Sequence, residues 1–243
     1  MSLKEASSKN PKHNYQSEPA FSICPSGEEF PLPKDEDYAI EFKKVEKLVT
    51  EQRLKNREIV VVMGVGFVGS VMAGVVADSV DPASGQPTKF VIGMQRPSVR
   101  SFWKIPYLNR GIAPVEAEDP EVAPLIRRCV LDKKTLLATF TYDVLSLADV
   151  VVVDVQCDYH KETFGDVKKG QADIAALESS LQIIGEKIKP DCMVLIETTV
   201  PPGTTEYIAY PIIKKAFQKR GFEDRQPLLA HSFEGILGTS IKL

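Results

Sequence analysis

Three closely spaced glycines could let the backbone of this chain bind a pyrophosphate. They are the fixed positions of Gly64-Val65-Gly66-Phe67-Val68-Gly69, which follows the β-branched run at residues 59–63. Gly64 permits a tight turn, Gly66 lets the backbone approach the phosphates, and Gly69 lets the following helix pack on the strand. The free N–H groups at the start of that helix would attract the phosphate charge. Although the pattern alone is weakly specific, it predicts a dinucleotide site that includes Gly64, Gly66, Phe67, Val68 and Gly69.

The two residues after the next predicted strand, at 89–94, depart from the usual pattern for NAD. An acid at this position usually accepts hydrogen bonds from the adenosine ribose, but here the residues are Gln95 and Arg96. The amide of Gln95 can still bond to a ribose hydroxyl. Arg96 could stack on adenine, accommodate a 2′-phosphate or lie solvated on the surface. We place both in the predicted cofactor site, with NAD as the expected cofactor and NADP left open.

Two threonines follow a later strand and could either hold water or cap a helix. Thr198 and Thr199 come directly after the apolar run at 192–197 and shortly before a predicted helix at 206–220. A hydroxyl at the carboxyl end of a strand, beside the amides of a helix N-terminus, can hold a water molecule near a bound anion. Because threonine also caps helices, these residues alone leave both roles open.

Three further side chains near predicted strand ends have types that occur in catalysis. Glu234 could act as a base in a pocket that raised its pKa, and is otherwise an exposed carboxylate. His231 is more simply read as a surface or packing residue, and Cys157 has no evident basic pair to lower the pKa of its thiol. The four cysteines lie far apart without zinc-ligand spacing, which favours free thiols and no metal site.

The elements that must position these residues alternate between strands and helices. This alternation predicts an α/β fold, a doubly wound and mostly parallel Rossmann-like sheet that binds its ligands beyond the carboxyl ends of the strands. We expect a flexible extension at residues 1–35, a leading helix at 36–57 and one dinucleotide-binding domain at 58–243. Strands are predicted at 59–63, 89–94, 136–141, 150–155, 192–197 and 227–230, with helices after the glycine turn and at 120–130, 144–149, 173–188 and 206–220.

The composition excludes several classes of partner. The 243 residues carry a formal net charge of −3, so there is no basic field to recruit nucleic acid or an anionic membrane. The polar N-terminus has no secretory core, and we expect a cytoplasmic protein without nucleic-acid or membrane partners. Residues 59–77 are uncharged and long enough to span a bilayer. Their glycine spacing fits a strand, turn and helix better, which leaves a membrane anchor as the least favoured alternative.

The stretch Glu197-Thr198-Thr199-Val200-Pro201-Pro202-Gly203-Thr204-Thr205-Glu206 resembles the signature of the UDP-glucose/GDP-mannose dehydrogenase family. The glycine turn, the connector Leu108-Asn109-Arg110-Gly111-Ile112-Ala113-Pro114 and the segment Leu229-Ala230-His231-Ser232-Phe233-Glu234 occur in the order that this family would have them. The resemblance covers residues 55–238. It implies an NAD-dependent enzyme that oxidises the C6 alcohol of a nucleotide sugar to a carboxylate in two hydride transfers.

The resemblance also implies roles for individual residues. Thr199 matches the threonine that helps to hold the active-site water, and Glu234 matches the glutamate implicated with that water in hydrolysis of a covalent intermediate. Gln156 and Cys157 occupy the loop where the family usually has Pro-Thr-Pro beside the cofactor. We therefore predict Thr199 and Glu234 as catalytic residues, and add Gln156, Cys157 and Thr198 to the cofactor site.

The family's central helical region and C-terminal domain, which carry its catalytic lysine and cysteine, have no counterpart in these residues. We therefore expect the N-terminal, cofactor-binding half of a nucleotide-sugar 6-dehydrogenase. It would take a nucleotide-sugar substrate only when a C-terminal domain is supplied, and the question of a homo-oligomer stays open. The alternative is a non-catalytic dinucleotide-binding module or a vestigial fragment.

Overall fold

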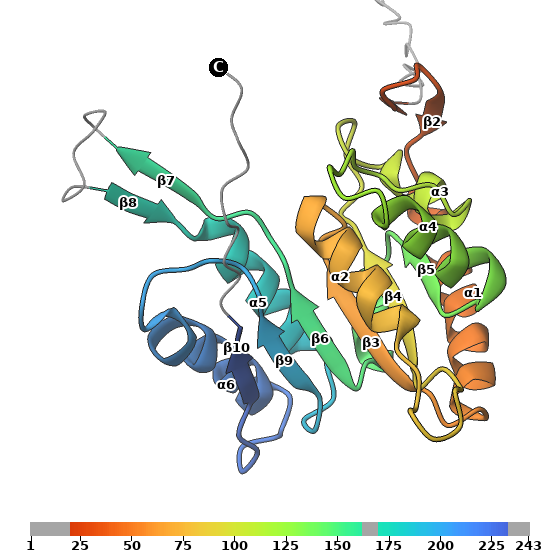
Figure 1. Ribbon diagram of the computed structural model, residues 1–243. Coiled ribbons are helices and arrows are strands. Elements are labelled where there is room, and N and C mark those ends of the chain that lie inside the picture. Colours follow the sequence, from red (N-terminus) through yellow and green to blue (C-terminus); the bar gives the residue numbers. More distant parts are fainter. Residues whose placement is uncertain (1–19, 162–169, 233–243) are drawn as a thin grey trace, which may run out of the picture.

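Six parallel strands form the central sheet of the computed structural model, which describes residues 20–161 and 170–232. The strand order is β10-β9-β6-β3-β4-β5 (Figure 1). The chain runs outward from β3 to β4 and β5, then crosses to the other side of β3 to add β6, β9 and β10. The strands are β3 (Glu58–Met63), β4 (Lys89–Met94), β5 (Leu136–Thr139), β6 (Val150–Val153), β9 (Met193–Ile196) and β10 (Leu228–His231).

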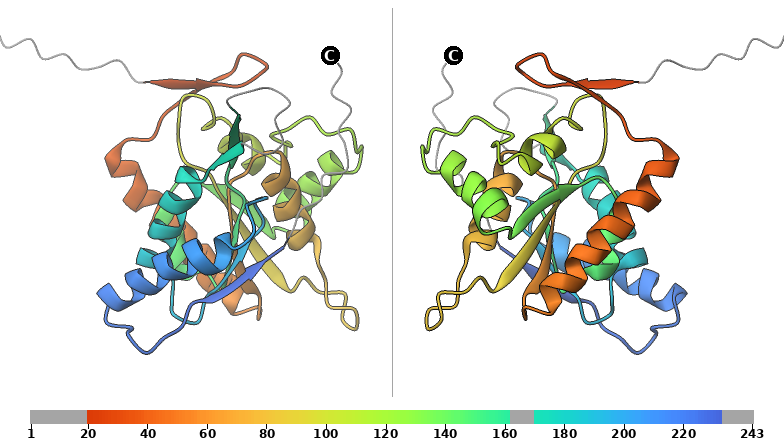
Figure 2. Two further views of the ribbon diagram at one scale, coloured as in Figure 1. Left: turned by 90° about the vertical axis from the view of Figure 1, so that its left-hand side faces the viewer. Right: turned by 90° about the vertical axis from the view of Figure 1, so that its right-hand side faces the viewer.

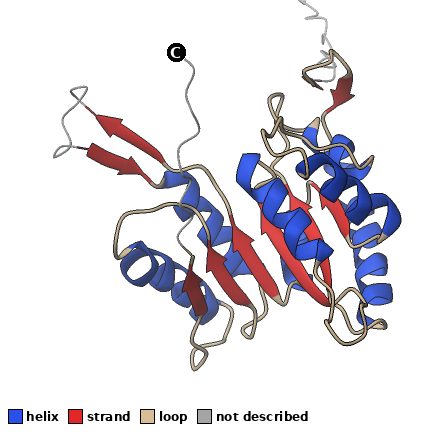
Figure 3. Ribbon diagram, viewed as in Figure 1, coloured by secondary structure: helices blue, strands red, loops and turns tan. Residues whose placement is uncertain are grey.

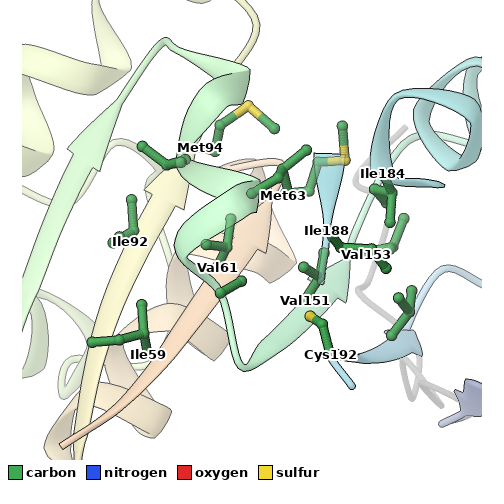
Figure 4. Close-up of a cluster of buried hydrophobic side chains, with 14 of the residues drawn as sticks. Ile59, Val61, Met63, Ile92, Met94, Val151, Val153, Ile184, Ile188 and Cys192 are labelled. Carbon is green, nitrogen blue, oxygen red and sulfur yellow. The ribbon is translucent and has the colours of Figure 1, made fainter. Parts of the chain in front are cut away.

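Helices cover both faces of this sheet, because its inner strands are apolar on both sides (Figures 2 and 3). On one face, Ile59, Val61 and Met63 of β3 pack with residues from α1, α5 and α6 (Figure 4). On the other face, Val60 and Val62 pack with α2, α3 and α4. The helices are α1 (Asp35–Arg53), α2 (Phe67–Asp78), α3 (Lys104–Asn109), α4 (Val122–Arg127), α5 (Ala175–Lys187) and α6 (Tyr210–Lys219).

The predicted doubly wound, Rossmann-like fold is confirmed, and the predicted strands of the sheet are all present. Some helices differ in kind. The predicted helix at 144–149 is a 3₁₀ helix at Tyr142–Leu147. π-Helical turns lie at Arg128–Asp132, after α4, and at Thr205–Ala209, before α6. Residues 59–77 form β3, the glycine turn and most of α2, and within the described ranges no helix is long and apolar enough to cross a membrane.

Two antiparallel hairpins were not predicted from the sequence. One joins β1 (Phe21–Ile23) to β2 (Glu29–Pro31), within the segment expected to be a flexible extension. Its contacts explain the difference: the Ser22 hydroxyl accepts a hydrogen bond from the Trp103 amide at 3.1 Å, and Glu28 pairs with Arg110 at 2.8 Å. These partners are distant in the sequence, so local composition could not reveal them. The other hairpin joins β7 (Asp158–Lys161) to β8 (Gly170–Asp173).

Asp149 ties together several elements at the amino end of the sheet. Its carboxylate accepts hydrogen bonds from the Ile59 amide at 2.9 Å and from Arg53 at 2.8 Å, and it pairs with Lys189 at 3.3 Å. Burial alone would raise the pKa of Asp149, but the hydrogen bonds from Arg53 and Ile59 and the nearby cations hold it below its usual range. The carboxylate therefore stabilises the folded state at neutral pH.

We expect Asp149→Asn to lower the free energy of unfolding at pH 7 by about 2 kcal/mol, because it removes charge-assisted hydrogen bonds. A carboxyl with a depressed folded-state pKa contributes stability above its unfolded pKa and loses it as the pH falls through the folded pKa. The difference between wild type and variant should therefore shrink on acidification in urea-unfolding curves. The exposed Asp191→Asn serves as control, and equal effects of the two substitutions would contradict the prediction.

Candidate functional site

A cleft of about 550 Å³ opens at the carboxyl ends of β3, β4 and β6. It lies where the strand order reverses on either side of β3, the position at which open α/β sheets bind their ligands. The start of α5 closes one side of it. The lining residues from the strand ends and their loops are Met63, Gly64, Gly66, Met94, Gln95, Arg96, Ser101, Lys104, Tyr142, Asp154, Val155 and Gln156.

Gly64 and Gly69 are glycines because the fold leaves no room for a side chain. Gly64 has φ +103°, and a Cβ added there would lie 1.9 Å from the carbonyl oxygen of Asp154. A Cβ at Gly69 would lie 1.9 Å from the carbonyl oxygen of Gly64 and 2.7 Å from Oδ2 of Asp154. These two glycines therefore allow the turn and α2 to pack against the end of β6.

Gly66 has a different environment, because an added Cβ there would meet no atom within 4 Å. It lines the cleft and is the N-cap of α2, where the amide groups of the first turn have no partner within the helix, although the Gly69 amide donates to Asp154. The fold itself gives no steric reason for a glycine at this position. Close approach of a ligand to the backbone, at a helix end that favours anions, supplies such a reason.

Gln95 and Arg96, two members of the predicted cofactor site, both line the cleft, and Gln95 also stabilises the glycine turn. Its Oε1 accepts a hydrogen bond from the Val65 amide at 3.1 Å, so its acceptor oxygen points to the protein backbone. Arg96 is exposed, and its charge opposes the rise that burial produces in the pKa of Tyr142. Ser101 and Lys104 join them in the lining. The sequence analysis missed both because they lie in a connector without a motif.

The other predicted site residues lie outside the lining of this cleft, with one exception. Gln156 lines it, and its Nε2 donates to the carboxylate of Asp158 at 2.9 Å. Thr198 is buried. Its hydroxyl accepts a hydrogen bond from the Val155 amide at 3.0 Å, which joins the ends of β9 and β6. Thr199 is exposed next to it. The other predicted site residues that do not line the cleft are Phe67, Val68, Gly69 and Cys157. The predicted catalytic residue Glu234 lies outside the described residues.

A pair of carboxyl groups behind the glycine turn was not predicted from the sequence. Asp154 accepts a hydrogen bond from the Gly69 amide, and burial raises the pKa of its carboxyl group. Glu197 is 5% exposed, and its Oε2 has no hydrogen-bond partner. Burial, followed by the charge of Asp154, raises the pKa of Glu197, against the opposing effect of His231. Both groups therefore hold a proton more readily than an exposed carboxyl would.

Comparison with known proteins gives a consistent picture. The NAD-binding domain of the UDP-glucose/GDP-mannose dehydrogenase family matches residues 58–233. The structure is similar to NDP-N-acetyl-D-galactosaminuronic acid dehydrogenase from Methanosarcina mazei Go1, with 30% identity, a TM-score of 0.62, and coverage of 80% of this chain and 38% of the other. A search of the curated proteins finds no match.

Two more distant structures share the fold. UDP-D-ManNAc dehydrogenase from Pyrococcus horikoshii is 24% identical, with a TM-score of 0.56 and coverage of 74% of this chain and 37% of its own. GDP-mannose dehydrogenase from Pseudomonas aeruginosa is 21% identical, with a TM-score of 0.54 and coverage of 72% and 36%. This chain therefore spans less than two fifths of the length of each of these dehydrogenases.

The different environments of Gly64 and Gly66 predict unequal losses of stability when each is replaced by alanine. Gly64→Ala should cost roughly 3 kcal/mol or more, because it combines a positive φ with a clash against backbone atoms. Gly66→Ala, in open space at a helix N-cap, should cost less than about 1 kcal/mol. Urea unfolding of the two variants measures the difference. Equal destabilisation would show that the packing of Gly64 against Asp154 does not limit the fold.

Glu197→Gln should stabilise the protein increasingly as the pH rises from acid to neutral. A carboxyl with a raised folded-state pKa contributes its stability below the unfolded pKa, and this is lost as the pH rises through the folded pKa. The glutamine variant avoids that loss because it carries no charge. Thermal unfolding at several pH values tests this, with the exposed Glu206→Gln as control. A constant difference between wild type and Glu197→Gln across the pH range would refute a titrating Glu197.

Proposed function

The chain belongs to the UDP-glucose/GDP-mannose dehydrogenase family through its NAD-binding domain, and on this premise we propose that it is the cofactor-binding half of a nucleotide-sugar 6-dehydrogenase. The environment of Gly66 is the observation that carries the proposal. A glycine that the fold does not need stands at a helix N-terminus, in a cleft at the switch point of the sheet. A pyrophosphate held by those amides accounts for all three features.

The lining residues fit a dinucleotide. Gly66 and the first turn of α2 would hold the pyrophosphate, while Gln95 fixes the turn through the Val65 amide. Arg96 lies on the β4 side, where the adenosine would bind, and Gln156 lies on the β6 side with the start of α5. Bound NAD supplies the hydride acceptor for the oxidation of an alcohol.

Asp154 would influence the binding of this anionic ligand. Its carboxyl lies beneath the glycine turn and already accepts the Gly69 amide. A negative charge there would repel a pyrophosphate, whereas the neutral form would not. Because burial raises the pKa of Asp154, proton uptake at this group would favour binding of the cofactor.

The proposed catalytic roles rest on the family resemblance. Thr199 is exposed at the carboxyl end of β9, where its hydroxyl would hold the water molecule that attacks the intermediate. Glu234 would act with it on that water. We propose that the sugar is held mainly outside the matched region, since the similar dehydrogenases are more than twice as long as the region they share with this chain.

Calorimetric titration of the purified chain with NAD and ADP-ribose tests the proposal. Wild type should bind both ligands. Gly66→Val should weaken binding at least tenfold, about 1.4 kcal/mol, because its side chain would fill the space that the pyrophosphate needs. Val75→Ala, at an exposed position farther along α2, is the control and should bind as wild type does.

An assay of NAD reduction with UDP- and GDP-sugars completes the test. We expect turnover only when a C-terminal half is added to the chain. Binding of NAD without turnover under those conditions would favour a non-catalytic module. Failure of wild type to bind NAD or ADP-ribose at millimolar concentrations would refute the proposed function.

A further inference from the structure

Two cations face the adenosine side of the cleft without a neutralising acid. Arg96 and Lys104 both line it, and neither forms an ion pair with any residue in the described ranges. Lys104 is only partly exposed, and burial lowers the pKa of its amine. Its Nζ lies 6.0 Å from the centre of the Trp103 ring, and no carboxylate among the described residues pairs with it to offset its desolvation. An anionic ligand would offset it.

The acid that usually binds the adenosine ribose is missing from the same place. Gln95 stands there instead, and its only acceptor oxygen is already bonded to the Val65 amide. Among the described residues that line the cleft, Asp154 is the one acid, and it follows β6, on the opposite side of β3 from β4. The charges of the cleft are therefore divided, with both cations on the adenosine side.

Hydrogen bonds hold the connector that carries these cations in place. The Ser101 hydroxyl donates to the carbonyl oxygen of Arg96 at 3.0 Å, and it lies 2.7 Å from the hydroxyl of Ser98. The indole N–H of Trp103 donates to the carbonyl oxygen of Arg100 at 3.1 Å. Because the loop between Arg96 and Lys104 is fixed by its own contacts, binding a ligand between them costs less ordering.

We propose that this cleft accepts NADP as well as NAD, with Arg96 and Lys104 binding the 2′-phosphate and the Ser101 hydroxyl beside them. The inference rests on the proposed dinucleotide function and names the feature of the ligand that the β4 side recognises. A guanidinium matches the geometry of a phosphate with two parallel hydrogen bonds, and an ammonium adds a compact charge. A ribose-binding carboxylate would repel this phosphate, and no described residue that lines the cleft on that side is an acid.

Three adenosine phosphates that differ in the position of their phosphate groups distinguish specific binding of a 2′-phosphate from general attraction of anions. The full chain would be titrated calorimetrically at low ionic strength with 5′-ADP, 2′,5′-ADP and 3′,5′-ADP, and then with NAD and NADP. We expect 2′,5′-ADP to bind roughly tenfold more tightly than either of the other two, as charge-assisted hydrogen bonds to one phosphate would give. NADP should bind at least as tightly as NAD.

Variants of the connector assign the effect to residues. Arg96→Ala and Lys104→Ala should each remove most of the preference for 2′,5′-ADP and leave the affinity for 5′-ADP within about threefold. Arg100→Ala is the matched control, since it removes the same charge from an exposed position of the same loop outside the lining. It should retain the preference. Thermal unfolding of each variant verifies that it is folded.

The outcomes separate this inference from the proposed function. Binding of NAD with no preference for the 2′-phosphate would overturn the inference and leave the proposed function standing. An equal loss of 5′-ADP and 2′,5′-ADP affinity in Arg96→Ala would also overturn it, because that result indicates stacking on adenine. Binding of none of these ligands by wild type would overturn both.

Discussion

The close approach of the glycine turn to the end of β6 is the constraint on which the cleft depends. The Gly64 amide donates to the carbonyl oxygen of Met94 at 2.8 Å, and the Asp154 amide donates to that of Met63 at 2.9 Å. The ends of β3, β4 and β6 are thus joined by backbone hydrogen bonds at one level. A side chain at Gly64 would meet the carbonyl oxygen of Asp154. The shape of the site therefore depends on backbone contacts, with side chains added around it.

The two ends of the sheet use polar groups differently. At the amino end, Asp149 is fully engaged with Arg53, Lys189 and a backbone amide. At the carboxyl end, Ser70 Oγ and Glu197 Oε2 are the buried side-chain polar atoms without a partner among the described residues. Unsatisfied buried polar groups cost stability. Both atoms lie toward the end of the sheet where the cleft opens, although neither residue lines the cleft, so the cost in stability falls near the proposed site.

The distribution of charge across the cleft follows from the topology. β4 and β6 lie on opposite sides of β3, so the loop after β4 contributes Arg96 while the loop after β6 contributes Asp154. A ligand that lies across β3 meets a cationic and an acidic environment at its two sides. In the proposed binding mode, the adenosine of a dinucleotide would lie on the cationic side and its pyrophosphate at the start of α2.

The sequence by itself determined the strands of the central sheet and the glycine turn, because those depend on local patterns. The runs that form β3, β4, β6 and β9 are continuous and apolar, as buried parallel strands require, and the spacing of Gly64, Gly66 and Gly69 identified the turn. The family signature at 197–206 was also a local pattern, and the family match supports it.

Only the tertiary structure decided which side chains meet in the cleft. Lys104 and Ser101 reach it because their connector folds back over the end of β4, and Asp154 and Glu197 become neighbours because β6 pairs with β9. The hairpin formed by β1 and β2 could not be predicted for the same reason, because it is held by contacts with residues around Trp103. The position of Thr198 also depends on tertiary contacts: its hydroxyl accepts a hydrogen bond from the Val155 amide, and the residue does not line the cleft. Contacts between residues distant in sequence arise from packing, which no local pattern encodes.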